Sequence, residues 1–256
     1  MVFLEKQIII DNLSVCYYQS GNFDPKKTTV FLHGWNSEAR HLKSIFENLE
    51  SFVAFDLPGF GKSDCPDVPW GVAEYADFLQ NFLEKLEINN PIMVGHSFGG
   101  NILIKYLSSG EKVRKMIIIS GAGIRKTGLK IVAYKIIAKI FGPLLKLPGI
   151  SIFRNTIRTK IYKAIDSEDY MESGEMEEIY KKIIREDLSE GMKRIKTKTT
   201  LIWGSDDKAT PVWQGEKMHE FISGSKLFII SHAGHFSFLD RPDEFNKIFL
   251  SEIDVS

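Results

Sequence analysis

The chain has 256 residues, of which 43% are apolar and 26% are charged, and this is enough to bury the core of one large α/β domain or two small ones. Its 33 basic residues balance 33 acidic residues, so the net charge does not favour a nucleic acid or a membrane surface as a partner. Two cysteines, Cys16 and Cys65, are too few for a disulfide framework, and their spacing is not that of a metal site.

The first ten residues contain Glu5 and Lys6 within a short apolar stretch. This pattern is typical of neither a signal peptide nor a membrane span, and we expect a cytoplasmic protein. Residues 7–10 are instead predicted to form a strand, and residues 13–18 a second one. Because the two lie close together with no helix between them, they predict an antiparallel hairpin at the edge of a sheet.

Six further apolar runs predict strands along the rest of the chain. They lie at residues 28–33, 52–56, 92–94, 115–120, 199–203 and 226–231. Several are continuous in Ile, Val and Phe, as in strands that are buried on both faces. Most are separated by helical stretches, such as residues 72–86 and 101–107. This alternation predicts a mostly parallel sheet with right-handed crossovers.

The alternation stops between residues 124 and 196, which predict about three or four helices and no strand. The charges in this stretch are segregated: residues 125–163 contain ten basic residues and no acid, whereas residues 166–190 contain ten acids and three bases. We expect residues 1–123 and 197–256 to form a core domain and residues 124–196 a helical cap. At least part of the cap should cover the carboxyl edge of the sheet, where open α/β folds bind ligands.

The basic part of this insertion fits two interpretations. Lys126, Lys130, Lys135 and Lys139 recur at near-helical spacing, with apolar residues between them. A basic amphipathic helix of this kind can lie on an anionic membrane. A cap helix has the same pattern when its apolar face covers the site and its lysines face water. We favour the cap, and contact with a membrane surface stays an alternative.

A five-residue motif, Gly95-His96-Ser97-Phe98-Gly99, follows the strand predicted at residues 92–94. It has the G-x-S-x-G pattern of a nucleophile elbow, a sharp strand-to-helix turn that exposes a serine hydroxyl. The turn strains the backbone of the serine and leaves no room for a Cβ two residues before or after it. The pattern is common by chance, so its meaning depends on the rest of the chain.

A serine nucleophile needs a base within hydrogen-bond reach and a third group that orients the base. The strand predicted at residues 199–203 is followed by Asp206 and Asp207, and the last predicted strand is followed by His232 and His235. The order serine, acid, histidine, each at the carboxyl end of its own strand, is that of α/β hydrolases. At this point either aspartate and either histidine meets the requirement.

With these residues in place, the chain resembles the serine-nucleophile members of the α/β-hydrolase superfamily. It is similar to the small esterases, haloperoxidase-like enzymes and carbon–carbon bond hydrolases of that group. The Gly-x-x-Asp-x-x-x-Pro motif of the family maps onto Asp207, and its Ala-Gly-His turn maps onto His235. The family's His-Gly-x oxyanion turn maps onto His33-Gly34-Trp35, and residues 56–63 match a further family loop. The resemblance covers residues 10–123 and 197–250.

The resemblance implies an eight-stranded, mostly parallel α/β-hydrolase sheet flanked by helices, with a helical cap inserted after the sixth strand. It also implies acyl transfer, in which Ser97 attacks a carbonyl group and His235 takes and later returns the proton. Asp207 would orient His235 and stabilise its charged form. The backbone N–H groups of Trp35 and Phe98 would form the oxyanion hole.

Four further residues are candidates for the lining of a substrate pocket: His33, His96, Phe236 and Phe238. Each also has a structural interpretation. His33 would then support the oxyanion turn through a hydrogen bond, and His96 would be a packed residue of the elbow. The two phenylalanines would be part of the core.

We therefore expect a cofactor-independent serine hydrolase that cleaves a small or medium carboxylic ester through an acyl-enzyme. A carbon–carbon bond hydrolase, an amidase, a perhydrolase and a lipase could use the same residues. A serine at the elbow argues against dehalogenases and epoxide hydrolases of this fold, which have a carboxylate there. A non-catalytic binding protein is a further alternative, although it would not need all three groups. The expected partner is a small acyl compound, and the chain is expected to be a monomer or a dimer.

Two segments resemble phosphate-binding loops, but each lacks a glycine that the motif requires. Gly61-Lys62-Ser63 resembles the end of a Walker A motif, but Asp56 occupies the position of the required upstream glycine. Gly59 and Gly61 resemble a dinucleotide fingerprint, but its third glycine is replaced by Asp64. We therefore expect no nucleotide and no metal cofactor.

Overall fold

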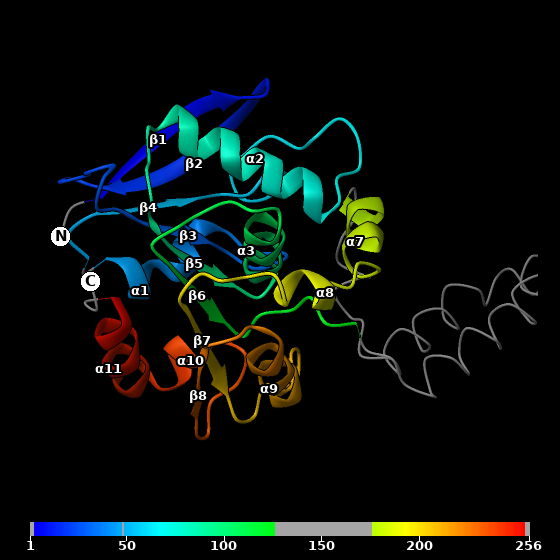
Figure 1. Cartoon of the computed structure of the whole chain (residues 1–256). Helices are drawn as coiled ribbons and strands as arrows, with labels where there is room; N and C mark the ends of the chain where they lie inside the picture. Colours follow the sequence, from blue (N-terminus) through cyan, green and yellow to red (C-terminus); the bar gives the residue numbers. More distant parts are fainter. Residues whose placement is uncertain (1–2, 48, 126–175, 254–256) are drawn as a thin grey trace, which may run out of the picture.

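A computed structural model of the chain describes residues 3–47, 49–125 and 176–253 (Figure 1). Within these ranges, eight strands form one sheet in the order β1-β2-β4-β3-β5-β6-β7-β8. The strands are β1 (Phe3–Ile10), β2 (Leu13–Ser20), β3 (Thr29–Leu32), β4 (Phe52–Phe55), β5 (Ile92–His96), β6 (Lys115–Ile119), β7 (Thr199–Gly204) and β8 (Lys226–Ile230). The predicted eight-stranded sheet is confirmed.

The hairpin predicted at the edge of the sheet is also confirmed. Strands β1 and β2 pair antiparallel along their whole length, from Phe3 opposite Ser20 to Ile10 opposite Leu13. The two residues of the turn, Asp11 and Asn12, both have a positive φ, as a two-residue type I′ turn requires. Strand β2 pairs antiparallel with β4, and every other neighbouring pair of strands is parallel.

Helices cover both faces of the sheet. In the described ranges they are η1 (Ala39–Leu42), α1 (Lys43–Phe46), α2 (Val72–Lys85), α3 (Phe98–Ser108), α7 (Glu177–Ile183), α8 (Ser189–Met192), α9 (Val212–Phe221), α10 (Ser237–Asp240) and α11 (Pro242–Ile253). One core lies between the sheet and α2, α3, α7 and α9, and a second lies between the sheet and α1, α10 and α11. Figure 1 shows these two groups of helices on opposite sides of the strands.

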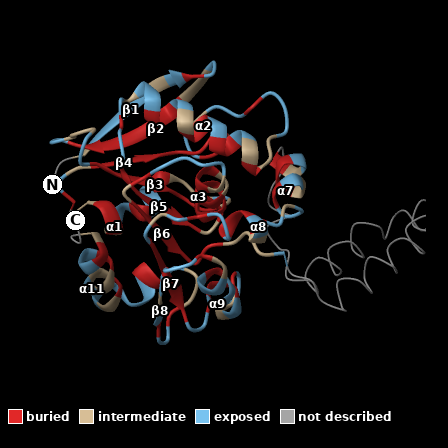
Figure 2. Cartoon of the chain, in the orientation of Figure 1, coloured by how far each residue is buried: buried red, intermediate tan, exposed pale blue. Residues whose placement is uncertain are grey.

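The side chains of the central strands alternate between the two cores. In β3, Val30 and Leu32 belong to the core beneath α2 and α3, whereas Phe31 belongs to the core beneath α11. This is the two-residue period of a strand with both faces buried, and Figure 2 shows the central strands buried along their length. The continuous apolar runs of the sequence reflect this double burial.

The insertion that the sequence predicts as a cap comes after β6. Residues 126–175, which include the four lysines of the basic stretch, lie outside the described residues. Its two described ends meet: the backbone N–H of Leu188 donates to the carbonyl of Gly123 (2.8 Å), and the N–H of Arg125 donates to the carboxylate of Asp187 (3.2 Å). Residues 187 and 188 therefore lie beside the point where the chain leaves the core, after α7 has already packed on the core through Ile179 and Ile183. Within the described ranges, no helix is both long enough and apolar enough to cross a membrane.

Candidate active site

Ser97 occupies the turn between β5 and α3 with a φ of 51° and a ψ of −112°. Its backbone N–H donates to the carbonyl of Ile119 at the end of β6 (3.0 Å). A Cβ built on Gly95 would lie 2.6 Å from the backbone of Gly99, and one built on Gly99 would overlap the carbonyl of Leu32. The strained serine and the need for glycine on both sides of it agree with a nucleophile elbow.

Asp207 follows β7, and its buried carboxylate accepts three hydrogen bonds. They come from the backbone N–H of Thr210 (2.8 Å), the hydroxyl of Thr210 (2.9 Å) and Nδ1–H of His235 (2.9 Å). Burial by itself raises the pKa of Asp207, but these donors and the nearby imidazole hold it below its ordinary value. Neighbouring Asp206 is exposed and accepts a hydrogen bond from the hydroxyl of Ser205.

His235 lies in the loop after β8, and its side chain is 18% exposed. Because Nδ1–H donates to Asp207, the other ring nitrogen, Nε2, carries the lone pair that a general base needs. His232 is exposed and has a φ of 55°, and its backbone N–H donates to the hydroxyl of Ser205. The structure therefore joins Asp207 to His235 and leaves Asp206 and His232 outside this arrangement.

Ser97 and His235 both lie beside His96, the last residue of β5. The rings of His96 and His235 are 4.7 Å apart between centroids, and Ser97 follows His96 directly. In the described part of the chain, the Ser97 hydroxyl makes no hydrogen bond with the His235 ring. Hydrogen bonds of this kind often tighten only when substrate is bound.

The turn His33-Gly34-Trp35, which follows β3, lies against the elbow. A Cβ built on Gly34 would be 3.2 Å from Cβ of Ser97. The backbone N–H groups of Trp35 and Phe98 donate to no other described residue. Phe98 is the first residue of α3, where N–H groups have no partner within the helix. Among the described residues, one donor without an acceptor therefore lies in the elbow, and a second lies in the turn that packs against it.

His33, a predicted candidate for the lining of the pocket, is fully buried and uses both ring nitrogens. Its Nδ1–H donates to the carbonyl of Gly34 (2.7 Å), and its Nε2 accepts the N–H of Leu57 (2.9 Å). Burial lowers the pKa of His33 to about 4. The ring supports the oxyanion turn and has no nitrogen left for a substrate.

The other three candidates for the pocket form one packed group. The ring of His96 lies 5.1 Å from Phe236 and 5.5 Å from Phe238. His96 and Phe238 are buried, whereas Phe236 is 43% exposed. Of the three, only Phe236 offers substantial surface to a ligand.

Three contributors to the site were not predicted from the sequence. The ring of Trp35 lies 4.9 Å from Phe60, 5.7 Å from Phe98 and 5.0 Å from Tyr180 of α7. Phe60 and Tyr180 therefore complete an aromatic wall beside the oxyanion turn. Thr210 is the third, and it holds the carboxylate of Asp207. A signal for Thr210 was present, because it lies inside the Asp207 motif, but no pattern in the sequence marks Tyr180.

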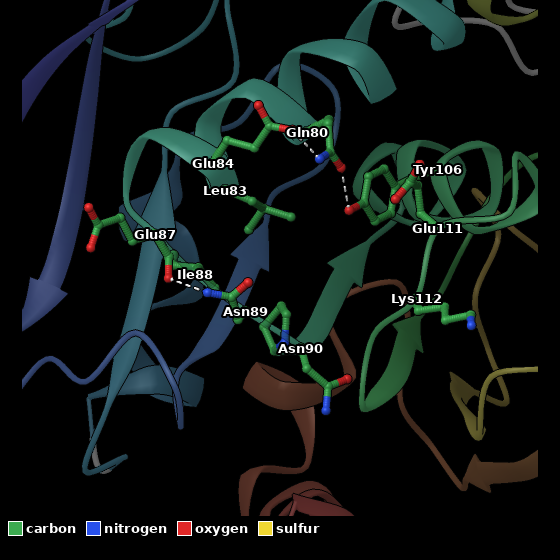
Figure 3. A pocket seen from close by; sticks show the side chains of 11 residues that line it. Gln80, Leu83, Glu84, Glu87, Ile88, Asn89, Asn90, Tyr106, Glu111 and Lys112 are labelled. Atoms are coloured by element: carbon green, nitrogen blue, oxygen red, sulfur yellow. Dashed lines mark hydrogen bonds between the residues drawn. The ribbon is translucent and has the colours of Figure 1, made fainter.

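A separate cavity of about 540 Å³ lies at the other end of α2 and α3 (Figure 3). Glu84, Glu87, Tyr106 and Glu111 are among its lining residues. Ser97 precedes the first residue of α3, and Tyr106 lies near the last, so the helix separates them by roughly 13 Å. The cavity is not part of the site at Ser97. The described residues include no group of three or more His, Cys, Asp or Glu side chains that could hold a metal ion.

Two known proteins with similar sequences are hydrolases by name. The chain is 25% identical over 256 residues to the uncharacterized hydrolase YugF of Bacillus subtilis (strain 168), with 93% of each chain covered. It is also 25% identical over 247 residues to 2-hydroxy-6-oxo-6-phenylhexa-2,4-dienoate hydrolase of Comamonas testosteroni, with 87% of this chain and 86% of the relative covered.

Solved structures share the fold. An esterase from Exiguobacterium antarcticum superposes with a TM-score of 0.73 at 22% identity, covering 98% of this chain and 99% of the esterase. A thermophilic esterase gives a TM-score of 0.71 at 23% identity, with both chains fully covered. The family model described as "Alpha/beta hydrolase family" matches residues 29–248. The chain therefore belongs to the alpha/beta hydrolase family and is a hydrolase on that fold.

Proposed function

We propose that the protein is a serine hydrolase that cleaves a small or medium carboxylic ester through an acyl-enzyme on Ser97. The observation that carries the proposal is the 2.9 Å hydrogen bond between His235 and Asp207, formed beside an elbow whose serine has a φ of 51°. These three residue types supply a nucleophile, a base and a group that orients the base.

The reaction begins when the Ser97 hydroxyl attacks the acyl carbonyl and its proton passes to Nε2 of His235. Asp207 stabilises the imidazolium that forms and keeps its ring in place. His235 then returns the proton to the leaving alcohol, which departs and leaves the acyl group on Ser97. Water repeats the sequence and releases the acid.

The negative charge that develops on the carbonyl oxygen is held by the backbone N–H groups of Trp35 and Phe98. Their lack of other acceptors among the described residues supports this role. The amino end of α3 adds a favourable dipole. Loss of one such donor costs about 3 kcal/mol of transition-state stabilisation.

Trp35 is only partly buried, and its ring packs on the buried rings of Phe60, Phe98 and Tyr180. This apolar surface supports an uncharged, apolar acyl group as the substrate part beside the oxyanion hole. A second candidate is a carbon–carbon bond hydrolase, which the name of the Comamonas testosteroni relative favours. The same serine, histidine and aspartate would serve that reaction. A panel of p-nitrophenyl esters, an anilide and a 2-hydroxy-6-oxo-dienoate would separate the two and also reveal an amidase.

Labelling with a fluorophosphonate tests the nucleophile without knowledge of the substrate. We expect the wild type to be labelled covalently and the Ser97→Ala variant to remain unlabelled, with both proteins showing the same thermal unfolding. The hydroxyl of Ser205, which lies in the loop after β7, provides a matched control, because Ser205→Ala should be labelled as the wild type is. A folded wild type that resists labelling would indicate a binding protein on this fold.

A further inference from the structure

We propose that His96 is a positioning residue that fixes the loop carrying His235 against the oxyanion turn. This inference rests on the proposed function, since it assigns a partner to the base of that reaction. His96 directly precedes Ser97. One short segment would therefore supply both the nucleophile and the side chain that lies between the oxyanion turn and the loop carrying His235.

The contact with the base loop is a hydrogen bond to the backbone. Nε2–H of His96 donates to the carbonyl oxygen of His235 (3.1 Å), and the two rings lie 4.7 Å apart between centroids. Because the acceptor is the main chain of His235, the bond restrains the loop and leaves the imidazole of His235 free to exchange protons.

The Nδ1–Cε1 edge of the His96 ring lies beside the oxyanion turn. A Cβ built on Gly34 would lie 3.1 Å from Nδ1 of His96, so the ring fills the space directly beside that residue. The ring therefore spans the gap between Gly34 and His235. Any larger residue at position 34 would press on the ring and on Ser97 together.

The topology of the sheet separates the strands that carry the two loops. The oxyanion turn follows β3 and the base loop follows β8, and three strands, β5, β6 and β7, lie between these two in the sheet. No backbone ladder joins β3 to β8 directly. His96 ends β5, the neighbour of β3, and its hydrogen bond to the carbonyl of His235 shows that the loop after β8 also comes to this point.

The ring of His96 is itself held in place. Its side chain is 2% exposed, and the rings of Phe236 and Phe238 pack against it. Burial, together with the nearby His235, lowers the pKa of His96 to about 3. The ring is thus neutral at neutral pH, with one N–H to donate, and adds no charge beside an imidazolium on His235. Such burial also leaves little surface for a substrate, which argues against a role in binding it.

Two variants separate the hydrogen bond from the packing. His96→Phe keeps an aromatic ring and removes the donor, whereas His96→Gln places an amide N–H near the position of Nε2. We expect His96→Phe to lower kcat for a p-nitrophenyl ester about 10- to 100-fold, with KM changed less than about twofold, and to slow fluorophosphonate labelling by the same factor. His96→Gln should recover kcat to within about threefold of the wild type. His96→Met is a second variant without a donor, should His96→Phe fail to fold.

The outcomes distinguish this inference from the proposed function. A wild type that is neither labelled nor active would overturn the function and, with it, the role of His96. A wild type that is active and depends on Ser97, combined with full activity of His96→Phe, would overturn the positioning role alone. Equal losses of kcat in the Gln and Phe variants would also overturn it, because the donor would then not matter.

Discussion

The two ends of the parallel strands hold buried polar groups that are arranged for opposite purposes. At the amino ends, Glu252 of α11 is 4% exposed and is bound by the first or second residue of each of three strands. Lys115 of β6 lies 2.5 Å from one carboxylate oxygen, which also accepts the hydroxyl of Thr200 of β7 (2.9 Å). Lys226 of β8 lies 2.8 Å from the other oxygen. Both oxygens of this carboxylate are therefore paired.

At the carboxyl ends, by contrast, the polar groups leave atoms free. Asp207 is satisfied by Thr210 and His235, but Nε2 of His235, the Ser97 hydroxyl and two backbone N–H groups make no hydrogen bond to the described residues. Ser97, Ser120 and His232 also have a positive φ here. Fully satisfied groups rigidify a fold, whereas unsatisfied and strained groups are typical of sites that bind and react. Under the proposed function, the amino edge serves stability and the carboxyl edge serves chemistry.

Replacing His235, the proposed base at the carboxyl edge, should give the largest effect, a loss of activity without a loss of stability. We expect His235→Gln to lower kcat/KM for a p-nitrophenyl ester about ten-thousand-fold, because Ser97 loses the group that takes its proton. The variant His232→Gln is the matched control, since this exposed side chain lies in the same loop, and it should keep full activity. Both should unfold within a few degrees of the wild type. A loss of activity in His232→Gln that exceeds the loss in His235→Gln would contradict the assignment.

A substitution at Glu252, at the amino edge, should lower the stability of the protein and leave its activity unchanged. In Glu252→Gln the buried ammonium of Lys115 loses its counter-charge, and we expect the free energy of unfolding to fall by about 3–5 kcal/mol. The kcat per folded molecule should stay at the wild-type value, because the site lies at the other end of the strands. Urea unfolding and ester hydrolysis measure the two quantities. Lys226→Ala is the control: its side chain is 58% exposed, so its loss should cost less than about 1 kcal/mol.

The pH dependence of stability offers a finer test of the same cluster. Burial by itself raises the pKa of Glu252, but the hydrogen bonds from Lys115, Lys226 and Thr200 lower it to about 2, against an ordinary value of 4.5. A lowered pKa stabilises the fold above pH 4.5, and this contribution, about 3 kcal/mol at most, is lost as the pH falls from 4.5 towards 2. The difference in unfolding free energy between wild type and Glu252→Gln should therefore shrink from pH 6 to pH 3. A constant difference would contradict this account.

The strands were predictable where burial is complete. Strand β5 and its neighbours are continuous apolar runs because both faces are covered. Strand β1 begins at Phe3, four residues before the predicted start. The prediction missed this part because residues 4–7 lie exposed at the sheet edge and include the charged Glu5 and Lys6. Helix α3 begins at Phe98, three residues before the predicted start at residue 101. The prediction missed this turn because Gly99 and Gly100 are weak helix formers, which are present here because close packing at the elbow requires them.

The candidate site was predictable where a turn demands particular residues. Ser97, Asp207 and His235 each lie in a short motif after a strand, and their order along the chain is informative by itself. Tyr180 was not predictable, because its contact with Trp35 depends on where α7 packs. The link between His96 and His235 joins residues 139 positions apart, and no local pattern encodes it.

The smallest effect that we predict concerns Thr210, which binds the carboxylate of Asp207. Its hydroxyl lies 2.9 Å from the carboxylate of Asp207 and 3.0 Å from the carbonyl of Ser120, so it connects the acid to the end of β6. We expect Thr210→Val, which keeps the shape and the backbone N–H, to lower kcat/KM about tenfold, the value of one hydrogen bond to a charged group. Thr210→Ser retains the hydroxyl and should stay within about twofold of the wild type. Equal rates for the Val and Ser variants would show that the backbone N–H of residue 210 is sufficient to hold Asp207, and that the hydroxyl contributes only to stability.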